Sequence, residues 1–292
     1  MMSGKDTEIL IKRLQTAGID EGDARFEVRD LLEAASSEEE LESFMRRRES
    51  GEPCSYITGF RYFYKDRFHV IPGVLIPRND TETAVETALA YAGQCDFPVG
   101  ELSLIPHMES QGNEVSVIDL CCGSGCIGIS VANELLRRGI NISRLVLADI
   151  SPEALRCASQ NVSDVLIRPD IAEVVRLDVL DDRAQIGGLF DMVLTNPPYI
   201  NDEDMENLPG DVSGYEPSLA LRGGKDGLMF YPAIANLSKR ILRDGGALIA
   251  EHGYDQRKDI ETVFAASGFG DIVCVKDPGG NDRVSFGRYY AG

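Results

Sequence analysis

Short apolar segments alternate with segments of helical periodicity over residues 115–292, and this alternation constrains the fold more than any other feature of the sequence. The apolar segments are 115–120, 145–148, 174–177, 190–195, 247–250, 272–275 and 283–289. The segments of helical periodicity are 127–138, 152–161, 228–242 and 255–267. Strands alternating with helices of this length predict an α/β fold with a doubly wound, parallel sheet. Because such sheets bind ligands at the carboxyl ends of their strands, the residues after each strand are the candidates for a functional site.

The first part of the chain is organised differently. Residues 5–50 carry apolar side chains at helical spacing, which predicts a small helical region. Residues 51–77 alternate aromatic and β-branched side chains between prolines and glycines, which favours a β-hairpin linker. We expect a helix over 80–93 and a loop over 94–114. The expected domains are therefore helical at 1–52, a hairpin linker at 53–79 and the sheet domain at 80–292.

A glycine-rich turn follows the first predicted strand of the sheet. Gly123, Gly125 and Gly128 form the pattern G-x-G-x-x-G at the start of a helix, and Asp149 lies 21 residues after Gly128. The pattern lets a cofactor approach the backbone while the acidic residue binds ribose hydroxyls, so it is typical of adenosine-containing cofactors. Asp119 disfavours the pyrophosphate of NAD and suits the cationic groups of S-adenosylmethionine. A tight turn that merely requires small residues is the alternative.

The fourth predicted strand is followed by Asn196-Pro197-Pro198-Tyr199. The prolines stiffen the backbone and leave a carbonyl free as an acceptor. With the side-chain carbonyl of Asn196, two acceptors can hold one NH₂ group, and Tyr199 offers a flat wall. Two acceptors aim the nitrogen lone pair of an amide or exocyclic amine at a methyl carbon, and no strong base is needed. The stretch predicts methylation of a planar nitrogen; a proline-rich turn is the alternative.

The net charge and the cysteines indicate which binding partners and which cellular compartment to expect for this protein. The formal net charge of −19 argues against direct binding of nucleic acid, because that affinity comes largely from Lys and Arg. The seven cysteines are odd in number and lack partners for a zinc site, so we expect reduced intracellular thiols and no metal. No apolar run is long enough to span a bilayer, and no secretory signal is visible. We therefore expect a cytoplasmic protein without a membrane partner.

These motifs resemble those of class I, S-adenosylmethionine-dependent methyltransferases of the amino-group type. Within that class the chain is similar to the HemK/PrmC family, the peptide chain release factor glutamine methyltransferases. The resemblance runs from about residue 40 to residue 292 and includes further segments. These segments are 51–59, 74–82, 148–155, 215–228, 251–256 and 280–283.

The resemblance implies a seven-stranded, mostly parallel class I sheet and a specific substrate. That substrate is the glutamine in the Gly-Gly-Gln motif of release factors, which are the implied protein partner. Asn196 and the Pro197 carbonyl are implied to hold the glutamine amide in a slot shaped by Pro198 and Tyr199. The implied catalytic residues are Asn196, Pro197 and Tyr199.

The resemblance also implies S-adenosylmethionine as cofactor, with S-adenosylhomocysteine as its product. Residues 121–125 are implied to line its methionine part, Asp149 to bind its ribose and Val179 to flank its adenine. The full implied set is Asp119, Cys121, Cys122, Gly123, Ser124, Gly125, Asp149, Val179 and Asn196. Two positions depart from the family pattern. Cys121 stands at the first glycine position, so the turn must accept a Cβ atom there, and Asn79-Asp80 replaces the usual Pro-Glu.

Three other functions stay open at this point. They are glutamine methylation of a ribosomal protein, adenine N(6)-methylation of DNA, and a silent binding protein that keeps the fold. A DNA enzyme needs a basic surface for the duplex, which the net charge opposes. Two side chains also have two interpretations each. Glu251 either touches the active site or serves a helix start, and Arg78 either contacts substrate or anchors the hairpin to the sheet.

Overall fold

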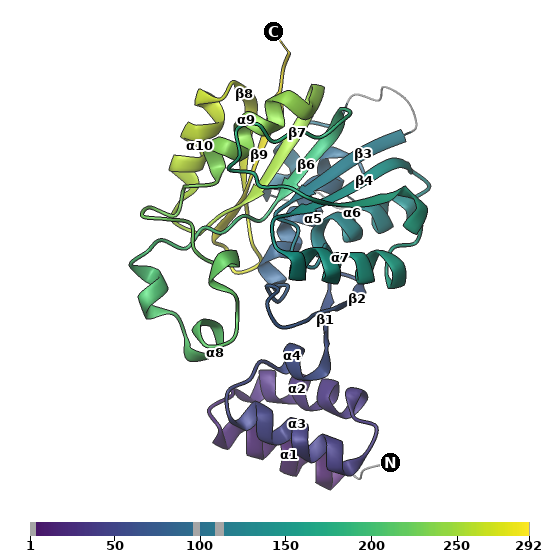
Figure 1. The fold of residues 1–292 in the computed structure, drawn as a ribbon, viewed down its shortest axis with the longest axis vertical. Coiled ribbons are helices and arrows are strands. Elements are labelled where there is room, and N and C mark those ends of the chain that lie inside the picture. Colours follow the sequence, from purple (N-terminus) through teal and green to yellow (C-terminus); the bar gives the residue numbers. More distant parts are fainter. Residues whose placement is uncertain (1–3, 96–99, 109–113, 292) are drawn as a thin grey trace.

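The computed structural model describes residues 4–95, 100–108 and 114–291. Its first three helices form the helical region expected from the sequence, and Figure 1 shows them at one end of the long axis. These helices are α1 (Gly4–Thr16), α2 (Glu21–Ala34) and α3 (Glu38–Glu49). Asp20 caps α2 and Ser37 caps α3, each by accepting hydrogen bonds from backbone N–H groups of the first turn. Their apolar faces pack into a separate core that includes Leu14, Leu31 and Met45.

The expected hairpin joins these helices to the sheet. Strands β1 (Phe60–Phe63) and β2 (Asp66–His69) pair antiparallel as a two-stranded sheet. The preceding residues differ from the prediction of extended alternation, because they form the short helix α4 (Cys54–Thr58). Gly59 ends this helix with a φ of 79°, a left-handed conformation that favours glycine. The aromatic alternation there reflects burial on a helix rather than on a strand.

The predicted seven-stranded, mostly parallel, doubly wound α/β sheet is confirmed. Six pairs of neighbouring strands hold the sheet together. Strand β9 pairs antiparallel with β7 and with β8, and the other four pairs are parallel. In order across the sheet, the strands are β5 (Ala172–Arg176), β4 (Asn141–Asp149), β3 (Glu114–Leu120), β6 (Phe190–Thr195), β7 (Leu242–Glu251), β9 (Asp282–Tyr289) and β8 (Phe269–Lys276).

Helices cover both faces of the sheet (Figure 1). The longer ones are α5 (Glu82–Tyr91), α6 (Cys126–Arg137), α7 (Pro152–Asp164), α9 (Tyr231–Ile241) and α10 (Arg257–Ala266). Shorter helical turns are η1 (Asn79–Thr81), η2 (Gly100–Leu104), η3 (Pro169–Ile171), η4 (Asp204–Asn207), α8 (Gly210–Ser213) and η5 (Ser218–Ala220). The loop expected over 94–114 contains η2, while 96–99 and 109–113 lie outside the described residues.

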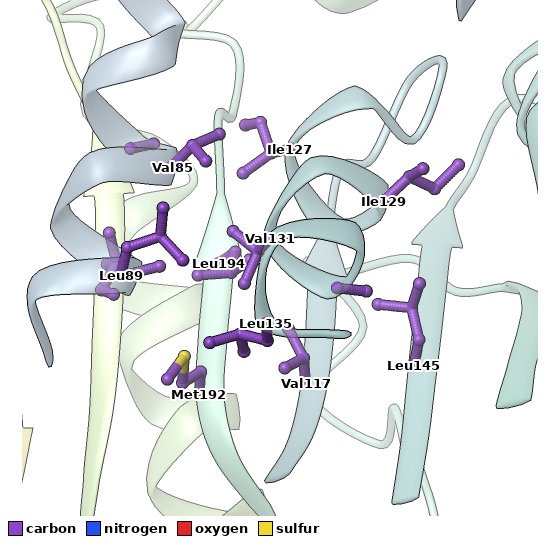
Figure 2. Close-up of a cluster of buried hydrophobic side chains, with 14 of the residues drawn as sticks. Val85, Leu89, Val117, Ile127, Ile129, Val131, Leu135, Leu145, Met192 and Leu194 are labelled. Carbon is purple, nitrogen blue, oxygen red and sulfur yellow. The ribbon is translucent and has the colours of Figure 1, made fainter. Parts of the chain in front are cut away.

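Alternate residues of the central strands point into two different cores. Val117 and Met192 belong to the cluster that Figure 2 shows beneath α5 and α6, together with Leu145 and Leu194. Their chain neighbours Ile118 and Val193 belong to the cluster on the opposite face, which α9 and α10 cover. Burial on both faces explains why these strands read as continuous apolar runs in the sequence.

The register brings the ends of four strands to one edge. Leu120 of β3 pairs with Ala148 of β4 and with Thr195 of β6, and Thr195 pairs in turn with Ala250 of β7. The next residues along each strand are Cys121, Asp149, Asn196 and Glu251. The sheet therefore places these four side chains along its carboxyl edge, where the sequence predicts a functional site.

None of the helices within the described ranges is long and apolar enough to cross a membrane.

Candidate active site

A cavity of about 270 Å³ opens at this carboxyl edge. Its wall combines the segment after the hairpin with the exits of β3, β4 and β6 and the loop before α9. Eight of the predicted site residues line it: Cys121, Cys122, Gly123, Ser124, Asp149, Val179, Asn196 and Pro198. Four predicted residues are not part of the lining, namely Asp119, Gly125, Pro197 and Tyr199. The cofactor and substrate residues predicted from separate motifs thus meet at one cavity.

The glycine turn owes its shape to left-handed backbone. Cys121, Gly123 and Gly125 have φ angles of 56°, 56° and 79°. Glycine adopts this conformation without strain, whereas a side chain such as that of Cys121 costs roughly 1–2 kcal/mol. The Gly125 N–H donates to the Cys122 carbonyl at 2.7 Å and closes the turn. The departure noted at position 121 is therefore accommodated by a left-handed cysteine.

Gly128 serves the packing of helix α6 rather than the cavity. A Cβ atom at this position would lie 2.8 Å from Leu147 Cδ2 and 3.0 Å from the Cβ of Asp119, so these neighbours would have to shift. The absence of a side chain lets α6 approach β3, and the Gly128 N–H then donates to Asp119 Oδ2 at 2.9 Å. The third glycine of the motif is therefore required for the contact between helix and strand.

Asp119 lies behind the turn and is fully buried. Its second oxygen, Oδ1, has no hydrogen-bond partner among the described residues. Burial raises the pKa of this carboxyl to about 7, although the Gly128 N–H opposes the shift. Asp119 thus offers an unsatisfied acceptor close to the turn without itself forming the cavity wall.

Asp149 is held in place by backbone donors on both sides. Its carboxylate accepts from Gly123 N–H and from Ser151 N–H, both at 2.9 Å. Burial raises the pKa of Asp149, and these two N–H groups counteract part of the rise. Ser151 in turn caps α7, so the helix start and the glycine turn together fix this carboxylate on the cavity wall. A carboxylate oxygen has capacity for further donors, such as hydroxyl groups.

The far part of the cavity is apolar. Leu177, Val179, Ile150 and Phe230 line it. Val179 follows Asp178, whose carboxylate accepts from the Leu180 N–H at 2.9 Å and thereby fixes the turn after β5. Apolar side chains of this kind suit an aromatic ring.

The Asn196–Tyr199 segment is anchored by residues far away in the chain. Asn196 Nδ2 donates to the Thr81 hydroxyl at 3.4 Å, and the Tyr199 hydroxyl donates to Glu251 Oε1 at 3.4 Å. The Tyr199 carbonyl accepts from Gln256 Nε2 at 3.0 Å. Burial raises the pKa of the Tyr199 hydroxyl, and the nearby Glu251 carboxylate raises it further, so this group stays protonated. The segment is therefore rigid on its inner side while Asn196 reaches the cavity.

Gly223 allows a second loop to pack directly on this segment. A Cβ atom there would come within 2.7 Å of the Tyr199 Cα, so a side chain does not fit. The Gly223 N–H donates to the Ile200 carbonyl at 2.7 Å, and the Ile200 N–H donates to the Leu221 carbonyl at 2.9 Å. The glycines of segment 215–228 thus brace the backbone that carries the predicted catalytic residues.

Glu251 faces the site and does not serve a helix start, since α10 begins later, at Arg257. Its side chain is buried, and Oε1 accepts from the Tyr199 hydroxyl. An interaction with Thr81 lowers the pKa of the carboxyl, while Oε2 has no hydrogen-bond partner in the described part of the chain. Glu251 thus contacts Tyr199 of the candidate active site, as one of its two interpretations expects, and its role in the reaction stays a prediction. Sequence reasoning missed Thr81 and Gln256 as contacts of this site; both lie inside segments of family resemblance, and that is their sole signal in the sequence.

Arg78 lines the cavity and pairs with Glu216 of the loop that follows Tyr199. The Glu216 side chain is buried, and its Oε2 has no other partner among the described residues. The pair joins the segment after the hairpin to the loop that carries Glu216, rather than to a strand of the sheet. Because Arg78 lines the cavity, its contact with substrate stays a prediction.

Comparison with known proteins identifies relatives of this chain. Residues 93–208 match the family model of the methyltransferase small domain. A release factor glutamine methyltransferase from Clostridium botulinum is 35% identical over 87% of this chain and 82% of its own length. One from Geobacter sulfurreducens is 36% identical over 83% of this chain and 75% of its own. Among solved structures, a ribosomal protein L11 methylase from Lactobacillus delbrueckii subsp. bulgaricus aligns over 76% of this chain and 84% of its own, at 15% identity and a TM-score of 0.45.

Identity at this level over most of both chains settles the family expected from the sequence motifs. The chain belongs to the release factor glutamine methyltransferases.

Proposed function

We propose that this protein transfers a methyl group from S-adenosylmethionine to the side-chain amide nitrogen of the glutamine in the Gly-Gly-Gln motif of release factors. The observation that carries the proposal is that Asn196 and Asp149 line one cavity. An amide-holding segment and a ribose-binding carboxylate therefore meet at one edge of the sheet. In this proposal residues 1–52 recognise the protein substrate, 53–79 link them to the sheet, and 80–292 perform the transfer.

The residues at the cavity fit S-adenosylmethionine. The buried, unsatisfied oxygen of Asp119 suits a cationic group, the turn at 121–125 leaves room for the methionine part, and Asp149 keeps acceptor capacity for ribose hydroxyls. The apolar wall that includes Val179 suits adenine. When bound, S-adenosylmethionine supplies an electrophilic methyl group on a sulfonium. Ser124 and Cys122 complete the proposed binding set.

The protein's own contribution is to orient the substrate amide. Asn196 Oδ1 and the Pro197 carbonyl accept the two N–H bonds of the glutamine side chain, which raises electron density on its nitrogen and fixes the direction of its lone pair. Pro198 and Tyr199 restrict the amide to one plane. Positioning and electrostatics thus lower the barrier without a strong base, because the nitrogen loses its proton after the methyl group arrives.

Two other substrates share the chemistry. Adenine of DNA requires a cationic surface for the backbone, and the net charge of −19 disfavours it. A ribosomal protein glutamine shares the amide and differs only in the surrounding protein. The release factor is favoured by the relatives named above, whose substrate is the release factor.

A parallel labelling experiment tests the proposal. S-adenosylmethionine carrying a labelled methyl group is incubated with the protein and, in separate reactions, with a release factor, with total ribosomal proteins and with duplex DNA. We expect label in the release factor alone. Label confined to ribosomal proteins or DNA would replace the proposed substrate, and label in none of them would contradict the proposed activity.

A further inference from the structure

The side chain of Thr81 stands between the predicted catalytic amide and a buried acid. It comes from η1, far from both in the chain, and is only 2% exposed. Its hydroxyl accepts from Asn196 Nδ2 at 3.4 Å, and its interaction with the Glu251 carboxyl lowers the pKa of that acid. Thr81 also lines the cavity. Thr81 makes no side-chain cap for α5, so its hydroxyl is not required to start that helix.

These contacts impose a direction on the hydrogen bonds. A threonine hydroxyl has one hydrogen to donate, and an ionised carboxylate can only accept. When Glu251 is ionised, the Thr81 hydrogen therefore points to Glu251 and the Thr81 lone pairs point to Asn196. Asn196 must then turn its NH₂ group towards Thr81. If the amide were flipped, its oxygen would face an oxygen lone pair, and a buried acceptor without a donor is costly.

The direction matters for the reaction because the substrate amide needs an acceptor. An Asn196 side chain whose NH₂ group faces Thr81 keeps Oδ1 free for the glutamine N–H. A flipped side chain would present NH₂ to NH₂ and could not hold the substrate. We propose that Thr81 and Glu251 are positioning residues that fix the amide orientation of Asn196 for glutamine binding and methyl transfer. This proposal rests on the proposed function.

We call the three side chains Glu251, Thr81 and Asn196 the relay. The protonation state of Glu251 affects the hydrogen-bond directions in this relay, and it depends on the charged groups around Glu251. Arg283 of β9 favours its ionised form, whereas Asp80 of η1 opposes it. Arg283 is shared with Asp277 at 3.0 Å and lies 3.6 Å from Asp80, so it is only partly available to Glu251. Tyr199 donates to the carboxyl, and the Tyr231 hydroxyl of α9 donates to the Glu251 backbone carbonyl. Burial dominates and raises the pKa of Glu251 to about 7.

A pH dependence of transfer follows from this arrangement. Protonated Glu251 can donate to Thr81, which releases the Thr81 hydrogen to point at Asn196 and favours the flipped amide. The rate should therefore be highest above a pH of about 7 and fall as pH drops through that value.

The first test compares hydroxyl removal with hydroxyl retention. Thr81→Val keeps the shape of the side chain and removes the hydroxyl, and we expect kcat for release-factor methylation to fall at least about tenfold. Thr81→Ser keeps the hydroxyl and should retain a rate close to that of the wild type. Thr87→Val is the matched control on α5, because the buried Thr87 hydroxyl donates to the Thr83 carbonyl at 2.7 Å and has no further partner among the described residues. It should lower the melting temperature without lowering kcat.

The second test is the pH profile of Glu251→Gln, which cannot ionise at this position. We expect a lower kcat at all pH values, no loss of rate specific to acidic pH, and an unchanged dissociation constant for S-adenosylmethionine. This profile stays informative even if Thr81→Val fails to fold.

Wild-type kcat in folded Thr81→Val, or an acidic loss of rate in Glu251→Gln equal to that of the wild type, would overturn the relay while leaving the proposed function intact. A wild-type protein that methylates no glutamine would overturn the proposed function and the relay together.

Discussion

The two halves of the cavity are held in place by different means. The cofactor half, made of residues 121–125 and Asp149, is shaped by backbone: left-handed φ angles in the turn, and N–H groups that donate to the carboxylate. The amide half, made of residues 196–199 with Thr81 and Glu251, is shaped by side chains. Asn196 and Thr81 are 115 positions apart, and Tyr199 and Glu251 are 52 apart.

This difference has consequences for how each half responds to change. A backbone-shaped turn depends on a few local residues, and its failure affects cofactor affinity. A side-chain network depends on correct folding of distant elements, and its failure affects the orientation of the reacting amide while the cofactor still binds. The two halves should therefore be separable by substitution, and the following predictions measure how far that separation holds.

The largest effect is expected for Asn196→Ala. It removes the acceptor of the substrate amide, and removal of one such group typically lowers kcat by about 100- to 1,000-fold. The dissociation constant for S-adenosylmethionine, measured by calorimetry, should change little. Asn201→Ala is a nearby control, since among the described residues the Asn201 side chain hydrogen-bonds only with the loop residue Asp204. A parallel loss of cofactor affinity in Asn196→Ala would show that the two halves are not separable.

Asp149→Ala should have the opposite signature. Loss of hydrogen bonds to a charged group costs roughly 1.5–3 kcal/mol, so we expect the dissociation constant for S-adenosylmethionine to rise about 10- to 100-fold. At saturating cofactor, kcat should recover most of its wild-type value. Asp170→Ala is the control, because within the described ranges that exposed carboxylate forms an ion pair only with Arg168. Unchanged affinity in Asp149→Ala would remove this carboxylate from the proposed cofactor set.

A smaller effect is expected for Gln256→Ala, which acts on the amide half through the backbone. Gln256 Nε2 donates to the Tyr199 carbonyl, and its Oε1 accepts from the Gly253 N–H at 2.8 Å. Without these bonds the active-site segment can shift, and we expect kcat to fall about tenfold. Arg257→Ala, on the next residue, should keep wild-type kcat. If steady-state kinetics showed weaker cofactor binding with an unchanged kcat, Gln256 would belong to the cofactor half instead.

The smallest effect concerns stability and tests the backbone origin of the cofactor half. Cys121→Gly relieves the left-handed strain at a φ of 56° but adds entropy to the unfolded chain. Cys121→Ala keeps the strain. We therefore expect the free energy of unfolding of Cys121→Gly to exceed that of Cys121→Ala by about 0.5 kcal/mol. Chemical denaturation of both variants measures the difference. Greater stability of the alanine variant would show that the turn stores no strain at this position.

The same division explains what could be predicted from the sequence. The alternation of segments predicted a doubly wound parallel sheet, the family resemblance implied its seven strands, and the ends of the strands predicted where the cavity lies. Asp149, the glycine turn and Asn196 could be placed there because each follows a strand directly. By contrast, the contacts of Thr81 and Gln256 depend on how η1 and the β7–α10 loop fold back onto the β6 loop, which no local pattern encodes. The short helix α4 was missed because five residues give too little periodicity.

The site of methylation within the release factor tests the central claim most directly. The wild-type protein and Asn196→Ala are each incubated with release factor and S-adenosylmethionine, and the modified residue is mapped by peptide fragmentation in a mass spectrometer. The account predicts a single methyl group on the glutamine side chain of the Gly-Gly-Gln motif with the wild type and almost none with Asn196→Ala. A methyl group on any other residue, or equal methylation of that glutamine by Asn196→Ala, would contradict it.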